Sequence, residues 1–537
     1  RFWALVGLGL FILFIVSFRL EVLTMFGLFN KVFTIVVLVL YVPVAYYFNT
    51  FGHRISFINR ISVFTVITAV VGICIAFFAE VPKPFLHLAT TGVTAGIVLT
   101  GIFILMVAPE IIAFFVFIVS SGTRQTKSLN HFLIISFVYL VYLVLFYISR
   151  AGIVDWNFLY VNLFLLLTIS GVIGIWSFRE RRSQYENIIE ADPFGTLFIL
   201  SLASVCFGTI AYFISTVNDP VLEAMNDLII YSHIGYGFIF VIYVLSNFIG
   251  LLGNNLPTYK VLYKPTNMPY FTSRFAGIIA TLAFVFVNTW QVPVNNAMAG
   301  YYNAAGDLYV SVKNYNLAIA FYEKAGTYGF LNHHSNYATA GIEAGRMNST
   351  KERAYFKRAS DRRPTEMSYL NFDQTYEREQ RWLESLLVLR DAAKVFPASG
   401  IIKNSQALVY AKLHLIDSAF LLLNEARGSN NIKSTAETNL IGLAAKENLT
   451  IQADSLYKLI GSTNAGVEAN ALAFANLQGR KIDMEIPATS DTVLNLFSAT
   501  LYNNYLINHQ DDIDSSFLNR VIDIAKKPSN TDYSEAL

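Results

Sequence analysis

Residues 302–325 read YNAAGDLYVSVKNYNLAIAFYEKA, a stretch in which small and aromatic residues recur at helical spacing. Small residues let two antiparallel helices approach closely, and an aromatic ring fills the space between neighbouring pairs. The residues expected at these contacts are Gly306 and Tyr309 on a first helix, and Ala318, Tyr322 and Ala325 on a second. A single pair of helices cannot bury its apolar face, so at least three pairs have to stack. The stretch therefore predicts a stack of helical pairs.

The same residue types return about every 34 residues along the chain. The recurring positions are Phe356 and Ala359, then Ser385, Leu389 and Ala392 (one residue short), then Ala419, Leu423 and Ala426, then Ala453 and Tyr457. Pro364 and Pro397 close two of the units because proline cannot continue the hydrogen-bond ladder of a helix. This pattern resembles the tetratricopeptide repeat (TPR) family over roughly 298–460. The resemblance implies an α-solenoid whose first helices form a concave groove for extended peptides or partner domains.

The register of the repeat also indicates which side chains would face that groove. They include Asn303, Asp307, His334, Tyr337 and Asn404. These polar residues either bind a protein partner or are solvated surface residues, and the sequence alone leaves both interpretations open.

The charged residues divide the chain into two unlike parts. Residues 1–297 contain 15 Lys/Arg and 11 Asp/Glu, whereas residues 298–537 contain 24 and 26. A charge-poor part followed by a part of ordinary charge is typical of a bilayer domain followed by an aqueous one. We therefore predict an all-α protein with two domains: a transmembrane helix bundle over 1–297 and a TPR-like solenoid over 298–537.

Nine apolar runs in the first part are long enough to cross about 30 Å of hydrocarbon. They lie at roughly 2–18, 32–48, 61–79, 89–120, 129–148, 157–178, 195–216, 228–252 and 273–292. The run 89–120 is interrupted by Ala108-Pro109-Glu110, so it is either one tilted, kinked helix or two half-spans. The sequence thus predicts about nine spans.

The positive residues between the runs predict an orientation. One set of alternate gaps carries ten Lys/Arg: Arg54, Arg60, Arg124, Lys127, Arg179, Arg181, Arg182, Lys260, Lys264 and Arg274. The other set carries four: Arg19, Lys31, Lys83 and Arg150. Because positive loops stay in the cytoplasm, we expect a cytoplasmic N-terminus and an extracytoplasmic, periplasmic second domain. The localisation expected from this is the bacterial inner membrane.

Two ionisable residues in the apolar runs are candidates for function. Glu110 beside Pro109 would face a polar cavity, bind an ion or relay protons, or it would sit at the interface between two half-spans. His233 follows an acidic gap and would belong to a cation or substrate site, or lie at the level of the lipid headgroups. The cysteines, Cys74 and Cys206, lack metal-ligand spacing, so no metal or cofactor is expected. No basic stripe for nucleic acid is present.

The chain differs from three families of polytopic envelope enzymes at the residues that do their chemistry. Lipid-linked sugar transferases need paired acidic residues in a long first outer loop, but gap 19–31 has only Glu21. O-antigen ligases need Arg and His in a large late outer loop, but gap 217–227 has neither. Exosortase-type transpeptidases need an Arg partner for an intramembrane cysteine, and Cys206 has none nearby in the sequence. No catalytic constellation follows from the sequence.

The leading hypothesis is a membrane-anchored scaffold of the cell envelope that recruits or assembles partner proteins in the periplasm or the membrane. The order of the whole chain, a many-span N-terminus followed by Asn288-Thr-Trp-Gln-Val-Pro293 and then directly by the repeats, resembles that of Bacteroidota polytopic membrane proteins associated with exosortase systems. The alternative is an envelope enzyme or transporter acting on lipid-linked glycan, of the glycosyltransferase or O-antigen-ligase type, with the repeats as an accessory domain.

Overall fold

The computed structural model of the chain is helical throughout the part that it describes, apart from turns and one isolated β-bridge, Met25 to Ala79. The described residues are 2–26, 30–52, 55–121, 127–151, 153–154, 162–181, 194–263, 270–287, 291–329, 331–448, 464–483, 487 and 493–533. This confirms the all-α class. Ala453 and Tyr457 of the repeat pattern lie outside these residues.

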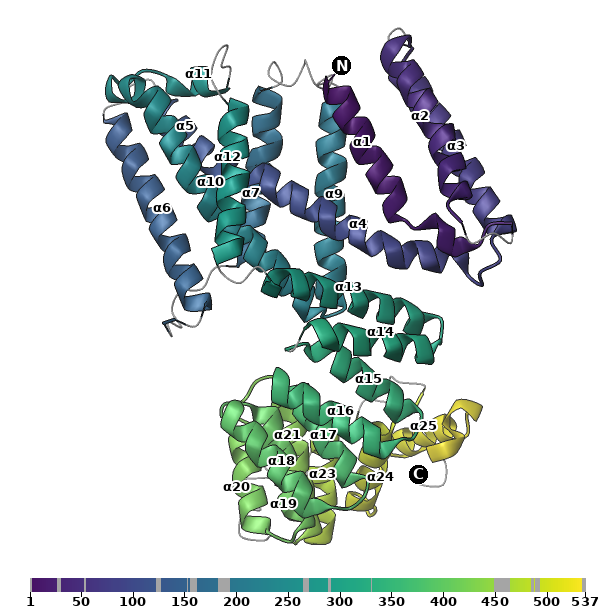
Figure 1. The fold of residues 1–537 in the computed structure, drawn as a ribbon. Coiled ribbons are helices and arrows are strands. Elements are labelled where there is room, and N and C mark those ends of the chain that lie inside the picture. The colour runs from purple at the N-terminus through teal and green to yellow at the C-terminus, as the bar shows by residue number, and fades with distance from the viewer. Residues whose placement is uncertain are drawn as a thin grey trace. The chain divides into compact units, whose positions relative to one another are not determined.

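The first part of the chain consists mainly of long helices (Figure 1), most of which are apolar. Their bounds are α1 (Phe2–Ser17), α2 (Val32–Thr50), α3 (Phe57–Phe78), α4 (Pro84–Val107), α5 (Glu110–Ser120), α6 (Ser128–Arg150), α7 (Leu163–Glu180), α9 (Thr196–Ser215), α10 (Asp219–Gly253), α11 (Thr258–Tyr263) and α12 (Tyr270–Val287). A short 3-10 helix, η1 (Leu20–Leu23), follows α1.

Within the described residues, seven helical segments are long and apolar enough to cross a membrane, or eight if α12 and the following helix, bent by 90°, count as one. The sequence predicted about nine. The difference lies at α1, of which 16 residues are described, and at α12, which counts only together with the helix that follows it. Helix α10 has 35 residues and includes most of the gap predicted at 217–227.

The interrupted run forms one 37-residue apolar segment, Pro84–Ser120, made of α4 and α5. Pro109 stands directly before α5, where its missing N–H costs no internal helix bond. Gly174 of α7 approaches the end of α4 so closely that an added Cβ would lie 2.8 Å from Val107. This packing holds the break, and with it Glu110, inside the helix bundle.

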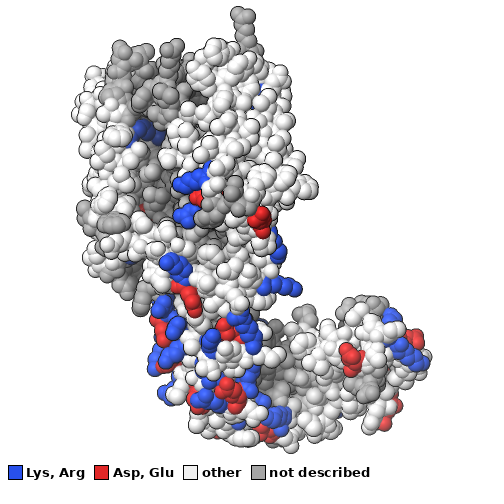
Figure 2. Space-filling model, turned by 45° about the vertical axis from the view of Figure 1, so that its right-hand side comes forward, with Lys and Arg blue, Asp and Glu red and all other residues white. Residues whose placement is uncertain are grey.

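Lipid is the environment that these helices require. Only 6% of the apolar window of α3 is buried within the protein, and Phe77 and Ile58 are 79% and 74% exposed. Exposing such a surface to water would be costly, at roughly 25 cal/mol for each Å² of apolar area. The face shown in Figure 2 agrees, because charged side chains are sparse over the spans and frequent over the later helices. We conclude that the chain is an integral membrane protein.

The second part of the chain is a series of shorter helices. They are α13 (Gln291–Ser311), α14 (Tyr315–Tyr328), α15 (His333–Gly345), α16 (Ser349–Arg362), α17 (Glu366–Glu377), α18 (Trp382–Val395), α19 (Gly400–Lys412), α20 (Ile416–Ala426), α21 (Lys433–Lys446), α23 (Ala465–Leu477), α24 (Leu496–Asn508), α25 (Ser515–Ala525) and the 3-10 helix η4 (Pro528–Tyr533).

The chain divides into two compact units, Arg1–Thr339 and Ala340–Leu537. Charge density changes near residue 297, as the composition indicated, but packing within the first unit continues to 339. The reason is that α13 packs on α10 and α4 as well as on α14. At the first of these contacts, a Cβ on Gly300 would lie 2.3 Å from the Cβ of Val221. The first helical pair is therefore part of the membrane unit.

In the second unit, each helix packs against the next one along the chain from α16 to α21. In addition, α17 contacts α19, and α19 contacts α21, so alternate helices form a continuous row. The core between α19 and α23 contains apolar side chains from each of the four described helices of this stretch, including Ala407, Leu423, Leu440 and Phe474. This row positions the polar side chains described below.

Candidate functional site

A buried polar network joins the first helical pair to the spans, and we call it the polar joint. It is built from Asn218, Asp219, Asn303, Asp307, Tyr322, Asn332, His333 and His334. Asn218 and Asn303 are both fully buried. The Asn218 amide donates to the backbone oxygen of Gly300 at 2.8 Å, and the Asn303 amide donates to Asn218 at 3.1 Å and to Asn332 at 3.0 Å. Three elements far apart in sequence therefore share one network.

Asp219 serves two helices in this joint. It is the first residue of α10, and its carboxylate also accepts from the backbone N–H groups of His333 and His334 at 3.1 and 3.0 Å. These N–H groups open α15, where the helix dipole favours a negative charge. One carboxylate thus fixes the start of α15 on the membrane unit.

Asp307 is the acceptor at the other side of the joint. Its Oδ1 accepts from the Tyr322 hydroxyl at 2.6 Å and lies 2.7 Å from Nε2 of His334. Burial alone lowers the pKa of His334, but the hydrogen bond to Asp307 and the charges of Asp307 and Asp219 outweigh it and raise that pKa above its ordinary value. His334 is therefore held in place by an ion pair that strengthens when its ring is protonated.

Three of the five residues predicted to face a groove, Asn303, Asp307 and His334, lie together in the polar joint. Their hydrogen bonds described above all go to groups of the same unit, so here they hold α13, α14 and α15 to α10. The ring of Tyr337 stacks on that of His333 with centroids 5.3 Å apart. The sequence analysis did not predict that Asn218 and Asp219 belong to this site. Nothing in the sequence links them to Asn332 and His333, each 114 positions further along the chain.

The fifth predicted residue, Asn404, belongs to a row of asparagines that we call the asparagine ladder: Asn404, Asn439, Asn470 and Asn504. They lie on α19, α21, α23 and α24. The Asn439 amide donates to Oδ1 of Asn404 at 2.9 Å. Asn470 donates to the backbone oxygen of Thr438 at 2.8 Å, and Asn504 to that of Ala469 at 2.9 Å. Asn439, Asn470 and Asn504 thus each donate to the preceding helix of the ladder, either to its asparagine or to the residue directly before that asparagine.

The ladder was missed in the sequence although it carries a signal. The four asparagines follow one another at 35, 31 and 34 residues (404 to 439, 439 to 470, 470 to 504), close to the period of the small and aromatic residues. Asn404 is buried, and the other three are partly exposed. A polar residue that recurs at the period of a helical repeat indicates that equivalent positions of successive helices lie next to one another.

Glu110 lies at the centre of a buried charge cluster. Its carboxylate accepts from Ser177 at 2.5 Å and from Arg181 at 2.7 and 2.8 Å, and it is also bonded by Arg274. Glu110 is 3% exposed and Arg181 1%. The guanidinium of Arg181 also lies 4.6 Å from the ring centre of Tyr263. The cluster pairs one carboxylate with two guanidinium groups and locks α5 to the end of α7 and to α12.

This cluster changes how the positive gaps are interpreted. Arg181 and Arg274 were counted as loop charges, but both pair with Glu110. Without these two, the more positive set of gaps still holds eight Lys/Arg against four. Arg54, Arg124, Arg182 and Lys264 of that set lie outside the described residues.

His233 is fully buried in α10, against α7. Its Nδ1 lies 2.7 Å from the backbone oxygen of Ile229, and its Nε2 lies 3.3 Å from Oγ of Ser170. Both ring nitrogens therefore have neighbours within the helix bundle. Among the described residues, no group of three or more His, Cys, Asp or Glu is placed to hold a metal ion.

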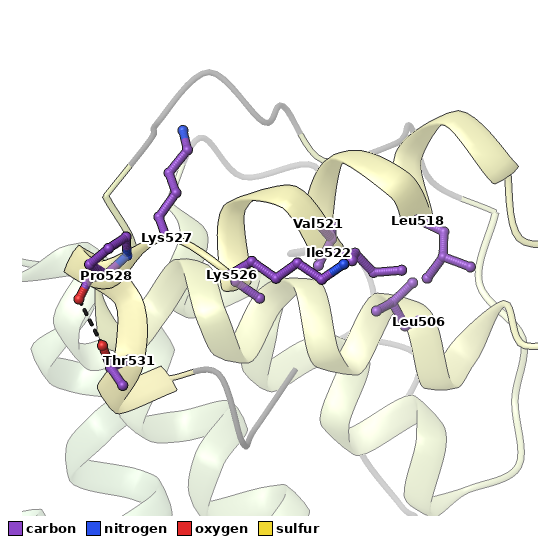
Figure 3. A pocket seen from close by; sticks show the side chains of 9 residues that line it. Leu506, Leu518, Val521, Ile522, Lys526, Lys527, Pro528 and Thr531 are labelled. Carbon is purple, nitrogen blue, oxygen red and sulfur yellow. Dashed lines mark hydrogen bonds between the residues drawn. The ribbon is translucent and has the colours of Figure 1, made fainter.

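Two cavities are relevant to binding. The larger, of about 980 Å³, lies within the first unit among α1, α4, α10, α12, α13 and α14, and we call it the membrane cavity. The smaller, of about 470 Å³, lies at α24, α25 and η4. Figure 3 shows Leu506 of α24 near Leu518 and Ile522 of α25, with Lys526 alongside. The Thr531 hydroxyl donates to the backbone oxygen of Pro528 at 2.7 Å. This hydrogen bond lies within η4, at the rim of the smaller cavity.

No protein-family model matches this chain, and no curated protein matches it either.

Proposed function

We propose that the protein is a membrane-anchored scaffold of the cell envelope whose helical repeats, of tetratricopeptide type, bind extended segments of partner proteins. The spans anchor the chain, and the polar joint fixes the first repeat to them. The later repeats present a row of helices to the aqueous phase. The single observation that carries the proposal is the asparagine ladder.

The chemistry of an amide suits a peptide backbone. A side-chain amide offers two N–H groups and an accepting oxygen, and a peptide offers one N–H and one C=O for each residue. In the ladder, each bond to the neighbouring helix uses one N–H of Asn439, Asn470 or Asn504. The other groups of the amide can bond an extended chain lying across the helices, independently of its side chains.

The proposed location is the bacterial inner membrane, with the N-terminus in the cytoplasm and the repeats in the periplasm. The unequal distribution of Lys and Arg between alternate gaps supports it. A reporter that is active only outside the cytoplasm, fused after residue 537, tests it. An inactive reporter on a stable fusion protein would reverse the orientation and place the partners in the cytoplasm.

Peptide binding is tested by site-specific photo-crosslinking of the full chain in its membrane. The probe replaces Thr435, an exposed residue one turn before Asn439 on α21. We expect crosslinks to a defined envelope protein that fall about thirtyfold in the double variant Asn439→Ala with Asn470→Ala, since two hydrogen bonds of about 1 kcal/mol each are lost.

The matched control is Asn424→Ala, which removes the same side chain from an exposed position on the second helix α20. It should leave the crosslinks unchanged. Equal crosslinking in the ladder variant and the control would show that the ladder only joins the helices, and the proposal would then lose its support.

The alternative, an envelope enzyme or transporter acting on lipid-linked glycan, is favoured by one observation: the membrane cavity has the size of a ligand site. Deleting the gene discriminates between the two. Loss of surface glycan, without a crosslinked partner in the parent strain, would favour the alternative. For the transporter version, Glu110→Gln should abolish transport, and an unchanged phenotype would exclude it.

A further inference from the structure

The membrane cavity has a polar end and an apolar end. At the polar end, Arg19 follows α1 and His87 lies in the first turn of α4, where its Nδ1 is 3.4 Å from the Tyr309 hydroxyl. At the other end, α4 contributes Ile97 and Val98, and the spans α10 and α12 contribute further apolar side chains such as Leu282. The cavity is therefore amphipathic along α4.

The cavity follows α4 for about three turns. His87 and Ile97 are ten residues apart on α4, which corresponds to about 15 Å at 1.5 Å for each residue. Over this length the lining changes from polar to apolar. A lipid with its headgroup beside His87 would thus have the apolar wall of the cavity beside its acyl chain.

The charge of the lining selects the kind of headgroup. Among the described residues that line the cavity there is one arginine, one histidine and no Asp or Glu. Arg19 is exposed, and it is close enough to Tyr301 and Tyr302 to act on both electrostatically. A guanidinium group binds a phosphate oxygen through charge-assisted hydrogen bonds. The polar end therefore complements an anionic headgroup.

We propose that the membrane cavity is a binding site for one anionic phospholipid, with its phosphate on Arg19 and its acyl chain along α4, α10 and α12. Helices α13 and α14 form part of the wall through Met298, Tyr301 and Leu317. A bound lipid would consequently contact both the spans and the first helical pair. This site is independent of the proposed binding of peptides.

Native mass spectrometry of the full chain in detergent tests the site. Phosphatidylglycerol and phosphatidylcholine with identical acyl chains are added in turn. We expect one phosphatidylglycerol to bind about fivefold more tightly, which is the effect of one cation at an anionic surface. Arg19→Gln should remove this preference, and because Arg19 is exposed the variant should fold normally. Lys83→Gln removes an exposed cation that does not line the cavity and should keep the preference.

Two further measurements distinguish a lipid site in the cavity from lipid bound elsewhere and from a site for phosphate alone. Ala297→Trp fills the cavity and should reduce binding of both lipids alike. Inorganic phosphate at the same concentration should not bind measurably, because it lacks the acyl chain. Equal binding of the two lipids by the wild type, an unchanged preference in Arg19→Gln, or phosphate binding as tight as that of the lipid would each overturn the proposal.

Discussion

The two units handle buried polar groups in different ways. The membrane unit gathers them into a few dense clusters, around Glu110 and in the polar joint, where residues from distant parts of the chain meet. The second unit distributes several of them along the chain, with one ladder asparagine on each of four helices. The difference follows from the solvent of each part: within lipid every polar group needs an internal partner, whereas near water a partly exposed amide does not.

This comparison predicts where single substitutions lower the stability most. A substitution in a dense cluster removes several interactions at once and leaves other charges without a partner. A substitution at one position of a repeated pattern removes one interaction, and the neighbouring helices keep theirs. Single substitutions should therefore have large effects in the first unit, and in the second only where a group is buried alone.

The largest effect is expected for Glu110→Gln. Removing this carboxylate leaves Arg181 and Arg274 beside each other without their shared counter-charge. Breaking a buried ion pair in this way typically costs about 3–5 kcal/mol. The variant should unfold at a clearly lower temperature in a thermal scan of the protein in detergent.

Two further variants separate charge from packing at this cluster. Adding Arg181→Gln to Glu110→Gln removes one of the two guanidinium charges that lose this carboxylate, and it should restore part of the stability. Glu80→Gln alters an exposed carboxylate of the same unit and should have almost no effect. A Glu110→Gln protein as stable as the Glu80→Gln control would show that the cluster is not what holds α5, α7 and α12 together.

Asp373 is an exception to the expectation of small effects in the second unit. It is a buried carboxyl group of that unit, and its hydrogen-bond partner is neutral. It is 3% exposed and accepts from Ser385 at 2.5 Å. Burial raises its pKa from 3.8 to about 7, although the bond from Ser385 acts in the opposite direction. Between pH 4 and 7, the folded protein therefore holds a proton that the unfolded chain releases, so stability falls as the pH rises.

The pH dependence of unfolding checks this sign. Each pKa unit corresponds to about 1.4 kcal/mol, so the wild type should lose a few kcal/mol across that window relative to Asp373→Asn. Asp391→Asn, at an exposed carboxylate on α18 that pairs with Lys394, should keep the trend of the wild type. Parallel curves for the wild type and Asp373→Asn would show that the carboxyl group is not buried as described.

A smaller effect is expected at Gly306, where the first helical pair closes. A Cβ at this position would lie 2.4 Å from the ring of Tyr322, which also donates to Asp307. Gly306→Ala should therefore cost about 1–3 kcal/mol through overpacking. Gly326→Ala, on α14 with open space around it, should instead stabilise the pair by up to about 1 kcal/mol. Thermal scans giving the same shift for both variants would contradict the close contact.

The contact between Gly306 and Tyr322 also shows what the sequence could predict. The two residues are 16 positions apart in a pattern of small and aromatic residues, so their spacing was sufficient to predict two paired helices here, although it did not predict that these two residues touch. The apolar runs were found for a similar reason, because hydropathy is local. The ends of the runs were less accurate: the polar residues at 217–227 suggested a gap, but the helix continues through most of them, with Asp219 partnered by α15.

The clusters could not be predicted because their members come from distant segments. Nothing local to Glu110 indicates that Arg181 and Arg274 approach it, and both arginines follow the pattern of loop charges. Asn303 and His334 were selected as groove residues from the register of the repeat, and only the fold places Asn218 and Asp219 beside them. A periodic feature such as the asparagine ladder is the intermediate case, since its signal is in the sequence but is weaker than that of the apolar residues.

The smallest effect is expected at a kind of helix cap that occurs once in each unit, with an asparagine side chain as the acceptor. The Asn348 side chain accepts from the backbone N–H of Lys351 at 3.3 Å and caps α16 in the second unit. Asn314 does the same for α14 in the first unit, with Leu317 at 3.4 Å. Replacing either by alanine should cost about 1 kcal/mol, and replacement by serine, which keeps an acceptor, should cost less.

Hydrogen exchange in the first turn of each capped helix measures this cost locally, where a loss of about 1 kcal/mol corresponds to about fivefold faster exchange. If the two units differ only in how they bury polar groups, Asn314→Ala and Asn348→Ala should accelerate exchange equally, because each cap is an exposed interaction within one helix. A much larger effect at Asn314 would mean that the polar joint also depends on the cap of α14. Exposed polar contacts of the first unit would then be coupled to its buried clusters, unlike those of the second unit.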